Sequence, residues 1–354
     1  MKINVLVTAA GSAISHGIIK SLKASSLDFS ITTTDNQPYA AGLYRGDAGY
    51  LVPLAKSSSF IEEVIKICRK ENINSICIGT DYELLPFAEN KKRIEKETNA
   101  KVIVSHPDII KIANDKWLTH LFLVKNKFPS IPSALPEDAS ELIEKEGFPL
   151  IVKPRISDSS KNTFIVNNKA GLNSKLEFLA KDKSNRFVNG KICTIIQKYM
   201  GNEENEFTSS TVVFDNKSYG IISMRREMRF GGHTTKAIID DFPEVSSMVT
   251  KVAQRLNPFG PCNFQSRLVD GVPYIFEINS RFSGTTGICS QVGFNSVEAC
   301  IRKVVLKEEP KMLSYKKGVM LRYFNEVFIS SESIAHLKEE KMVRNPESEI
   351  NSYL

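Results

Sequence analysis

The stretch YIFEINSRF, residues 274–282, decides the fold, because it combines a buried-strand pattern with polar side chains at every second position. Side chains alternate between the two faces of a strand, so Glu277, Asn279 and Arg281 share one face. Phe276 and Ile278 are then expected on the other, apolar face. Because buried polar groups need partners, the polar face indicates either a Glu277–Arg281 ion pair or a ligand site.

A second strand with polar side chains lies just upstream. Gln265 in CNFQSRL precedes Glu277 by twelve residues, and Asp270-Gly271 between them is typical of a hairpin turn. Such a hairpin brings Gln265 beside Glu277 and Asn279 on one face. Oxygen atoms of Gln, Glu and Asn suit Mg²⁺, which takes a few protein oxygens together with water and phosphate. The sequence therefore predicts a magnesium site on an antiparallel hairpin.

The composition is that of a globular protein with two or three domains. The chain has 354 residues, of which 42% are hydrophobic and 25% charged. No apolar run approaches the roughly 18 residues of a membrane span, and MKINVLVTAAG fits a first buried strand better than a signal peptide. The six cysteines show neither CxxC pairing nor metal-ligand spacing. Scattered reduced thiols predict a cytoplasmic protein.

The net charge of +7 does not by itself identify a partner. Lys and Arg are dispersed, and no basic run alternates with aromatic residues, so nucleic-acid binding is not expected. A site for an anionic small molecule such as a nucleotide explains the excess positive charge equally well.

The first 107 residues read as a doubly wound α/β domain. Apolar strands are expected at 3–8, 30–35, 75–80 and 101–105, and helices after the first strand and at 58–71. The segment GSAISHG at 11–17 departs from a dinucleotide-binding motif, because Ala13 and His16 stand at glycine positions. This domain is expected to end near His106-Pro107.

The rest of the chain divides into three parts. Residues 108–195 read as a lead-in helix and a small α+β lobe, and residues 196–310 as a larger lobe of antiparallel strands. Residues 311–354 form a polar C-terminal extension with one short apolar strand, VMLRYF. Within the small lobe, Lys153 lies inside the apolar strand LIVKP, where a cation needs an anionic partner.

Read together, these motifs resemble the ATP-grasp superfamily, and within it the branch similar to the carbamoyl-phosphate synthase large chain. The resemblance covers roughly residues 1–310. It rests on an ordered series of motifs: DKWLT, IVKP, IIQKYM, ENEFTSS, NFQSRL and FEINSRFSGTTG. It implies an ATP-grasp fold of mixed α/β and α+β class, with a doubly wound pre-grasp domain, a small α+β lobe and a larger antiparallel-sheet lobe.

The resemblance also implies a role for each motif residue. Lys153 and Arg281 would be the catalytic residues, with Lys153 in contact with adenine and the inner phosphates and Arg281 near the transferred phosphate. Glu206 would bind the ribose. Magnesium, two ions with manganese as an alternative, would be held by Gln265, Glu277 and Asn279. The nucleotide would be bound by Lys116, Lys153, Ser160, Lys161, Gln197, Lys198, Tyr199, Met200 and Glu206.

The implied reaction is an ADP-forming ligation of a carboxylate and an amine through an acyl phosphate. The expected substrate is a small amino acid, a peptide or a carboxylated sugar, and the resemblance is compatible with a homodimer. An alternative is a non-catalytic or regulatory nucleotide-binding protein of the same fold. The alternative is favoured by the loop RISDSSKNTF at 155–164, which has no glycine where the family has a glycine-rich phosphate loop.

Substrate residues must lie outside the ATP motifs. The segment SMRREMRFGGHTT, residues 223–235, suggests that Arg226 binds a carboxylate with support from Arg225 and Arg229. A charged hairpin in solvent explains the same pattern. The strand that contains Glu277 and Asn279 is called the metal strand below, after its expected ligands. Thr285 and Thr286, which follow it, are expected to form a wall of the same pocket.

Two acidic residues follow the strand at 75–80, at the edge where open α/β sheets bind ligands. Asp81 and Glu83 in GTDYELL are candidates for holding a substrate amino group. A helix N-cap explains Asp81 equally well.

Overall fold

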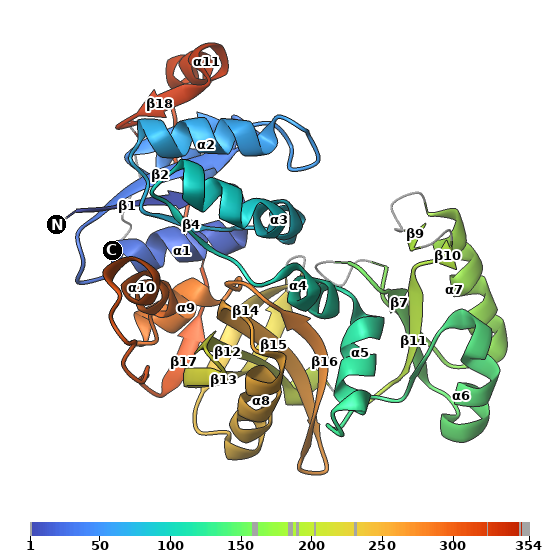
Figure 1. Ribbon diagram of the computed structural model, residues 1–354. Coiled ribbons are helices and arrows are strands. Elements are labelled where there is room, and N and C mark those ends of the chain that lie inside the picture. Colours follow the sequence, from blue (N-terminus) through green and yellow to red (C-terminus); the bar gives the residue numbers. More distant parts are fainter. Residues whose placement is uncertain are drawn as a thin grey trace.

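The computed structural model describes residues 2–157, 162–182, 187–188, 191–201, 203–229, 232–323, 325–346 and 348. The described chain forms two six-stranded sheets, one four-stranded sheet and a two-stranded ribbon. Each of the three larger sheets has its own helices (Figure 1). The four-stranded sheet stands to one side of the other two in that view.

The first domain is a parallel sheet with one antiparallel edge strand, in the order β18-β3-β2-β1-β4-β5. Its strands are continuous apolar runs, as in Val5 to Val7, because a parallel sheet is covered on both faces. Its elements are β1 (Ile3–Val7), α1 (Ala13–Lys23), β2 (Phe29–Asp35), the 3₁₀ turn Ala41–Tyr44, β3 (Ala48–Leu51), α2 (Phe60–Lys70), β4 (Ser75–Cys77), α3 (Asp81–Glu97) and β5 (Lys101–Ile103).

Two helices lead from the first domain into the small lobe, whose antiparallel sheet has the order β6-β11-β7-β8. Helices α6 and α7 share its core with the strands. The elements of this part are α4 (Pro107–Asn114), α5 (Lys116–Lys125), β6 (Ser133–Ala134), the 3₁₀ turn Pro136–Asp138, α6 (Ala139–Glu146), β7 (Leu150–Pro154), β8 (Phe164–Val166), α7 (Lys169–Lys181), β9 (Phe187–Val188), β10 (Lys191–Ile192) and β11 (Thr194–Lys198).

The large lobe is an antiparallel sheet in the order β16-β15-β12-β13-β14-β17. Helix α8 packs on the face that contains Phe264 and Ile278. Its elements are the 3₁₀ turn Glu203–Asn205, β12 (Glu206–Phe214), β13 (Lys217–Arg229), β14 (His233–Ile239), α8 (Pro243–Leu256), β15 (Gly260–Val269), β16 (Val272–Asn279), α9 (Thr286–Gln291), α10 (Ser296–Ile301) and a π-helical turn Arg302–Leu306. The ATP-grasp fold class expected from the sequence is confirmed by this arrangement and by the structural comparisons below.

The predicted hairpin of β15 and β16 is confirmed. Asp270 and Gly271 connect the strands with positive φ angles of 48° and 76°, as a tight hairpin turn requires. The register pairs Gln265 with Glu277. The three side chains expected to bind magnesium therefore start from adjacent positions.

A β-bulge corrects one detail of the expected alternation. The register of β15 and β16 shifts between Gln265 and Ser266, so that Phe276 is the extra residue. Ile275 and Ile278 are both buried in the core, whereas Phe276 is only partly buried. The sequence-based placement of Phe276 on the core face is wrong, because a bulge interrupts the two-residue period of a strand.

The C-terminal extension joins both large sheets. Its elements are β17 (Gly318–Leu321), α11 (Ser331–Glu340) and β18 (Met342–Arg344). Strand β17 overlaps the first three residues of the predicted strand VMLRYF and pairs with β14 of the large lobe. Strand β18 pairs with β3 of the first domain, as Figure 1 shows at its top. This segment thus connects the large lobe back to the first domain.

The first domain and the large lobe share one hydrophobic core. Val5 and Val7 of β1 pack in one cluster with Phe214 of β12 and Val297 of α10. Gly17 of α1 leaves room for α9, since an added Cβ would lie 3.0 Å from the backbone nitrogen of Gly287. These contacts hold the first domain against the large lobe, so that the loops after β1 and β4 lie next to the end of the metal strand.

Three general features complete the fold. In the parts of the chain described above, no helix is both long and apolar enough to span a bilayer. All six cysteines are buried as free thiols. No cluster of three His, Cys, Asp or Glu side chains arranged for a metal ion occurs among those residues.

We predict that Gly42→Ala destabilises the first domain. A Cβ at Gly42 would lie far inside van der Waals contact with the backbone oxygen of Ala10, in the loop between β1 and α1. Because backbone must move to relieve such a clash, the free energy of unfolding should fall by about 1–3 kcal/mol in chemical denaturation. The control is Gly171→Ala in α7, where a Cβ makes an ordinary 3.4 Å contact with the Asn168 side chain. Equal stability of the two variants would contradict the prediction.

Candidate functional site

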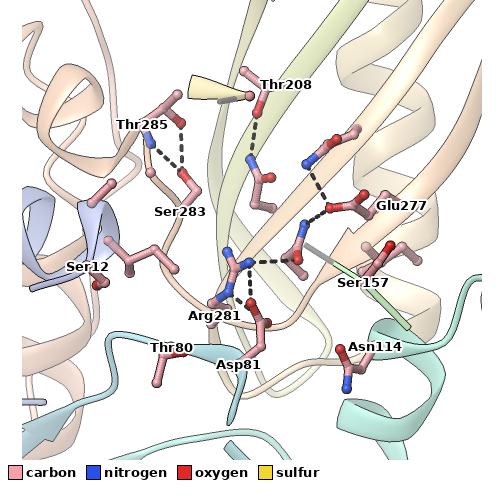
Figure 2. Close-up of a pocket in the computed structure, with 18 of the residues that line it drawn as sticks. Ser12, Thr80, Asp81, Asn114, Ser157, Thr208, Glu277, Arg281, Ser283 and Thr285 are labelled. Atoms are coloured by element: carbon pink, nitrogen blue, oxygen red, sulfur yellow. Dashed lines mark hydrogen bonds and ion pairs between the residues drawn. The ribbon is translucent and has the colours of Figure 1, made fainter. Parts of the chain in front are cut away.

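A cavity of about 480 Å³ lies between the first domain and the large lobe, with further walls from α4, α5 and the end of β7. This volume is in the range of small-molecule sites. Figure 2 shows Ser12, Ser283 and Thr285 at one end, and Glu277 and Ser157 at the other. Arg281 and Asp81 lie between these two ends.

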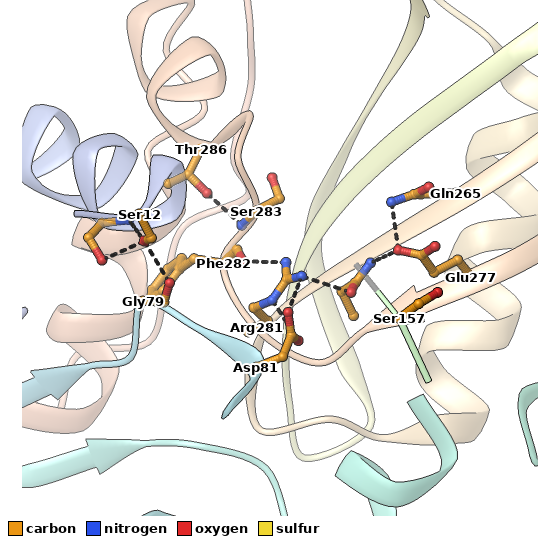
Figure 3. Close-up of polar contacts among 12 residues, drawn as sticks. Ser12, Gly79, Asp81, Ser157, Gln265, Glu277, Arg281, Phe282, Ser283 and Thr286 are labelled. Carbon is orange, nitrogen blue, oxygen red and sulfur yellow. Dashed lines mark hydrogen bonds and ion pairs between the residues drawn. The ribbon is translucent and has the colours of Figure 1, made fainter. Parts of the chain in front are cut away.

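Glu277 is the centre of the polar contacts in the cavity. Its Oε1 accepts hydrogen bonds from the amide nitrogens of Gln265 and Asn279, both at 2.9 Å (Figure 3). The hairpin register explains this geometry, since it places Gln265 opposite Glu277. The structure thus brings together all three predicted metal ligands.

Each of the two amides accepts a hydrogen bond from an arginine. Arg226 Nη2 donates to the oxygen of Gln265 at 2.8 Å, and Arg281 Nη2 donates to the oxygen of Asn279 at 2.9 Å. Each arginine also pairs with a carboxylate at 2.7 Å, Arg226 with Glu206 and Arg281 with Asp81. We call this connected set the Glu277 chain; its members are Glu206, Arg226, Gln265, Glu277, Asn279, Arg281 and Asp81.

The sequence left open whether Arg281 forms an ion pair with Glu277. The Arg281 guanidinium forms a bidentate ion pair with Asp81, at 2.8 and 2.7 Å, rather than with Glu277. Burial lowers the pKa of Arg281, but the adjacent Asp81 outweighs this effect and raises it above its ordinary value. Asp81 is the first residue of α3 and follows the N-cap residue Thr80, so the N-cap interpretation of Asp81 is wrong.

The Glu277 chain suits a divalent cation. Glu206 is paired with Arg226 and Arg267, and Asp81 with Arg281, whereas Glu277 forms no ion pair with a described residue. Glu277 Oε2 accepts no hydrogen bond from the described part of the chain. One carboxylate and two amide oxygens are ligands that Mg²⁺ takes. Gln265 and Asn279 would have to turn their oxygens from the arginines toward the ion, which would break both arginine contacts.

Lys153 is buried beside this chain, at 7% exposure. Desolvation and the neighbouring Lys116 lower its pKa to about 7, although Glu277 and Glu206 act in the opposite direction. Its ammonium lies 5.4 Å from the centre of the Phe276 ring, which the bulge turns away from the core. A buried ammonium with no adjacent carboxylate is a site for an anion.

Lys116 is held in place by two residues that the sequence analysis did not select. Asp115 caps α5 and accepts a bidentate contact from Arg155, at 3.0 and 2.6 Å. The Lys116 ammonium then donates to the backbone and side-chain oxygens of Ser157, at 3.2 and 3.3 Å. The adjacent motifs DKWL and VKPR could have indicated this ion pair, because each places a charge next to a selected lysine.

The residues predicted to bind adenine lie at the end of β11. Gln197 is buried and donates to Ser133 at 2.8 Å, while Lys198 donates to the carbonyl oxygen of Glu146 at 2.7 Å. Tyr199 lies against the guanidinium of Arg267, whose central carbon is 5.6 Å from the centre of the Tyr199 ring. These residues and Met200 do not line the cavity itself. Their assignment to adenine stays a prediction.

Arg267 also contacts Glu206, the acid predicted to bind the ribose. Its guanidinium lies 3.2 Å from Glu206, whose other oxygen accepts from Arg226. Glu206 is therefore buried with both oxygens engaged. Ser160 and Lys161, predicted to contact phosphate, lie outside the described residues.

The three predicted substrate arginines differ in environment. Arg226 is buried in the cavity wall, whereas Arg225 is exposed on the opposite face of β13 and outside the cavity lining. The side chain of Arg229 lies outside the described part of the structure. A substrate carboxylate at Arg226 would have to compete with Glu206. The assignment of these arginines to the substrate stays a prediction.

Of the other substrate candidates, some line the cavity and some do not. Thr285 lines the cavity, and its hydroxyl lies 2.7 Å from that of Ser283. Thr286 is buried outside the cavity lining and accepts the Ser283 N–H at 2.9 Å, which shapes the loop. Glu83 is buried among the first-domain strands, where Thr8 donates to it and burial raises its pKa to about 7.

Asn263 is a cavity residue that the sequence analysis missed. It lies opposite Asn279 in the hairpin and donates to the Thr208 hydroxyl at 2.9 Å. Its position two residues before Gln265 places it on the same face of β15, so the strand alternation contained the signal.

Two protein families match parts of this chain. Residues 5–103 match the family described as PylC-like, N-terminal domain. Residues 193–327 match the family described as ATP-grasp in the biosynthetic pathway with Ter operon. The first match covers the strands of the parallel sheet that precede α4. The second covers the large lobe and continues through β17.

The proteins similar in sequence include a synthase large chain and a ligase. The carbamoyl phosphate synthase large chain of Pyrococcus furiosus is 27% identical over 267 residues, which is 70% of this chain and 24% of that protein. A D-alanine–D-alanine ligase of Bacillus anthracis is 32% identical over 152 residues, which is 39% of this chain and 45% of the ligase. The chain thus spans less than half the length of either relative.

The fold is shared with N5-carboxyaminoimidazole synthetase from Staphylococcus aureus complexed with ADP. The TM-score is 0.68 at 16% identity, covering 91% of this chain and 82% of that one. Fold, motifs and family matches agree on the class: residues 193–327 match the ATP-grasp family named above, and the chain is similar to ATP-grasp proteins in sequence and fold. Within that class it is similar to the carbamoyl-phosphate synthase large chain, as the motifs indicated.

We predict that Lys153→Met stabilises the ligand-free protein at pH 7. The folded-state pKa of Lys153 is about 7, below the ordinary lysine value, so the unfolded chain binds more protons between pH 7 and pH 10.5. The stability of the wild type therefore rises with pH in this window. The advantage of the Met variant in unfolding free energy should shrink by on the order of 3 kcal/mol between pH 7 and 9.5.

The exposed Lys251 of α8 supplies the control for that measurement. Lys251→Met should differ from the wild type by the same amount at both pH values. A pH-independent difference for Lys153→Met as well would show that Lys153 is not desolvated.

We also predict energetic coupling between Asp81 and Arg281, which join the first domain to the metal strand. The two side chains are 26% and 12% exposed, so their ion pair is partly desolvated. A double-mutant cycle of Asp81→Asn and Arg281→Met should give a coupling free energy of about 1–3 kcal/mol. The exposed pair Glu63–Lys66 should give less than about 0.5 kcal/mol. Similar values for both pairs would contradict the prediction.

Proposed function

We propose that this protein is an ATP-dependent ligase that joins a carboxylate to an amine and forms ADP through an acyl phosphate. The observation that carries the proposal is the hairpin cluster of Gln265, Glu277 and Asn279, which faces the same cavity as buried cations. The named relatives are a carbamoyl phosphate synthase and a D-alanine–D-alanine ligase, and both names describe bond-forming enzymes.

In this proposal the nucleotide lies between the two lobes. Lys116 and Lys153 bind its phosphates, since both are buried cations without an adjacent carboxylate in the described structure. The end of β11, from Gln197 to Met200, contacts the adenine. Glu206 binds the ribose, which requires it to release part of its contact with Arg226 or Arg267.

Magnesium would be held by Glu277 with the amide oxygens of Gln265 and Asn279. When bound there, it would neutralise phosphate charge next to the transferred group. The contacts released by the two amides would leave Arg226 and Arg281 free to donate to phosphate or carboxylate oxygens.

The chemistry follows from positioning and charge. Transfer of the γ-phosphate to a carboxylate brings anionic oxygens together, and fixed cations reduce that repulsion. Arg281 reaches this point from the end of the metal strand and is oriented by Asp81. An amine then attacks the acyl phosphate and phosphate leaves. No nucleophilic side chain of this chain is required.

The proposal predicts that Glu277→Gln lowers turnover strongly but leaves the stability of the fold unchanged. The substitution keeps the size of the side chain and removes the charge that would hold magnesium. ATP-dependent phosphate release, assayed against amino acids, peptides and carboxylated sugars, should fall by about 10²-fold or more. Thermal unfolding without ligand should stay near the wild-type temperature, and Mg-ATP should raise that temperature in the wild type.

The outcome separates the candidate functions. Stabilisation by Mg-ATP without phosphate release for any substrate would favour the non-catalytic nucleotide-binding protein. Absence of both would contradict nucleotide binding altogether. Exposed Glu244 of α8 provides a matched control, because Glu244→Gln removes a carboxylate distant from the cavity lining.

A further inference from the structure

Three arginines line the cavity, and one of them has no carboxylate partner. Arg226 pairs with Glu206 and Arg281 with Asp81, each at 2.7 Å. Arg322 also lines the cavity, but no carboxylate of the described residues lies within ion-pair distance of it. Its guanidinium donates to the carbonyl oxygen of Gly284 at 2.5 Å. Among the described residues of the lining, Arg322 is thus the arginine whose charge is not balanced by a carboxylate.

The fold holds Arg322 at this position. The residue directly follows β17, and its N–H continues the sheet by donating to Thr235 O at 2.8 Å. Its side chain reaches the loop after the metal strand, where Arg281 Nη1 donates to the carbonyl oxygen of Phe282. The two guanidiniums are therefore anchored on carbonyls only two residues apart, Phe282 and Gly284.

Arg322 lies at the end of the cavity opposite the phosphate-binding lysines. Its partner Gly284 lies between Ser283 and Thr285, which Figure 2 places together with Ser12 and away from Glu277 and Ser157. Lys116, the other cation of the lining without a carboxylate, contacts Ser157 at the far end. A nucleotide held by the lysines would leave the Arg322 end free for a second ligand.

This end of the cavity is open and polar. An added Cβ at Gly284 would meet no atom within 4 Å, so there is space beside the Arg322 contact. The hydroxyls of Ser283 and Thr285 lie next to it, and Ser12 caps the N-terminus of α1, whose dipole favours negative charge. Burial lowers the pKa of Arg322, which agrees with a desolvated cation. A guanidinium stays charged in proteins, so it requires an anion.

We propose that Arg322 binds a carboxylate of the substrate that is not the one phosphorylated. The inference rests on the proposed ligase function and names its substrate class. The reacting carboxylate must lie beside Arg281 and the metal strand, so a group at Arg322 is a second anion. It is either a second carboxylate of the acid substrate or the carboxylate of an amino acid that supplies the amine. A planar guanidinium recognises a carboxylate through two parallel hydrogen bonds.

The test compares wild type with Arg322→Gln in ATP-dependent phosphate release. The acids are short linear dicarboxylates and their monoamides, and the amines are common amino acids and their carboxamides. We expect the wild type to prefer the free carboxylate in one of these two arms, which identifies the source of the anion. Arg322→Gln should raise the KM of that substrate by about 10- to 100-fold, the effect of losing a charged hydrogen bond, and abolish the preference over the amide.

Three readouts keep the interpretation specific. The ATP affinity of Arg322→Gln should equal that of the wild type, and kcat should change less than KM. Arg322→Lys should fall between the two, because it keeps the charge but loses the planar fork. Lys316→Gln, which removes an exposed cation from the same segment, should leave the KM values unchanged. An unchanged KM and preference in Arg322→Gln, or a collapse of its ATP affinity, would overturn the inference.

Failure of the ligase proposal is distinguishable from failure of this inference. If the wild type releases no phosphate with any pair, the same acids and amino acids are tested by thermal unfolding in the presence of Mg-ATP. Stabilisation of the wild type by a carboxylate, lost in its amide and in Arg322→Gln, would support the carboxylate site without the reaction. No carboxylate-dependent shift in the wild type would overturn it.

Discussion

The site depends on the hydrogen bonds that the carboxylate of Glu277 accepts. The carboxylate accepts from Gln265 and Asn279, whose oxygens in turn accept from Arg226 and Arg281. Because these groups are partly or fully removed from water, each must find a partner within the protein. The large-lobe sheet places the partners of Glu277 in register with it. The first domain supplies Asp81, the partner of Arg281. One carboxylate thereby orders side chains from two domains.

The charges in the cavity are balanced in its middle and unbalanced at its ends. The arginines of the Glu277 chain are neutralised by Glu206 and Asp81. Lys116 at one end and Arg322 at the other have no carboxylate within ion-pair distance among the described residues. Desolvated cations of this kind are stabilised by anionic ligands. The distribution suits a polyanion at the lysines and a smaller anion at Arg322.

The C-terminal extension is part of both the fold and the site. Strand β17 completes the large-lobe sheet and carries Arg322 to the cavity, while β18 extends the first sheet. The first domain also shares a hydrophobic core with the large lobe through β1, β12 and α10. These connections explain how a loop after the metal strand and the start of α1 come to form one end of a single cavity.

Short-range patterns in the sequence determined much of this protein. Strand alternation and the Asp270-Gly271 turn were enough to place Gln265 beside Glu277, because strand period and turn geometry depend on neighbouring residues. The ordered motifs were enough for the superfamily and its three-part fold. The bulge at Phe276 escaped prediction, since the extra residue is defined only by the register with the partner strand.

Only the tertiary structure decided which charges are balanced. Asp81 and Arg281 are 200 residues apart, and their pairing follows from the packing of the first domain against the metal strand. Arg226 matched the pattern of a substrate residue in the sequence, yet it lies beside Glu206. Arg322 lies in the predicted strand VMLRYF, where the sequence suggested no role for it, and it reaches the cavity because β17 pairs with β14. Sequence periodicity specifies the face on which a side chain lies, whereas its partner across the cavity depends on long-range packing.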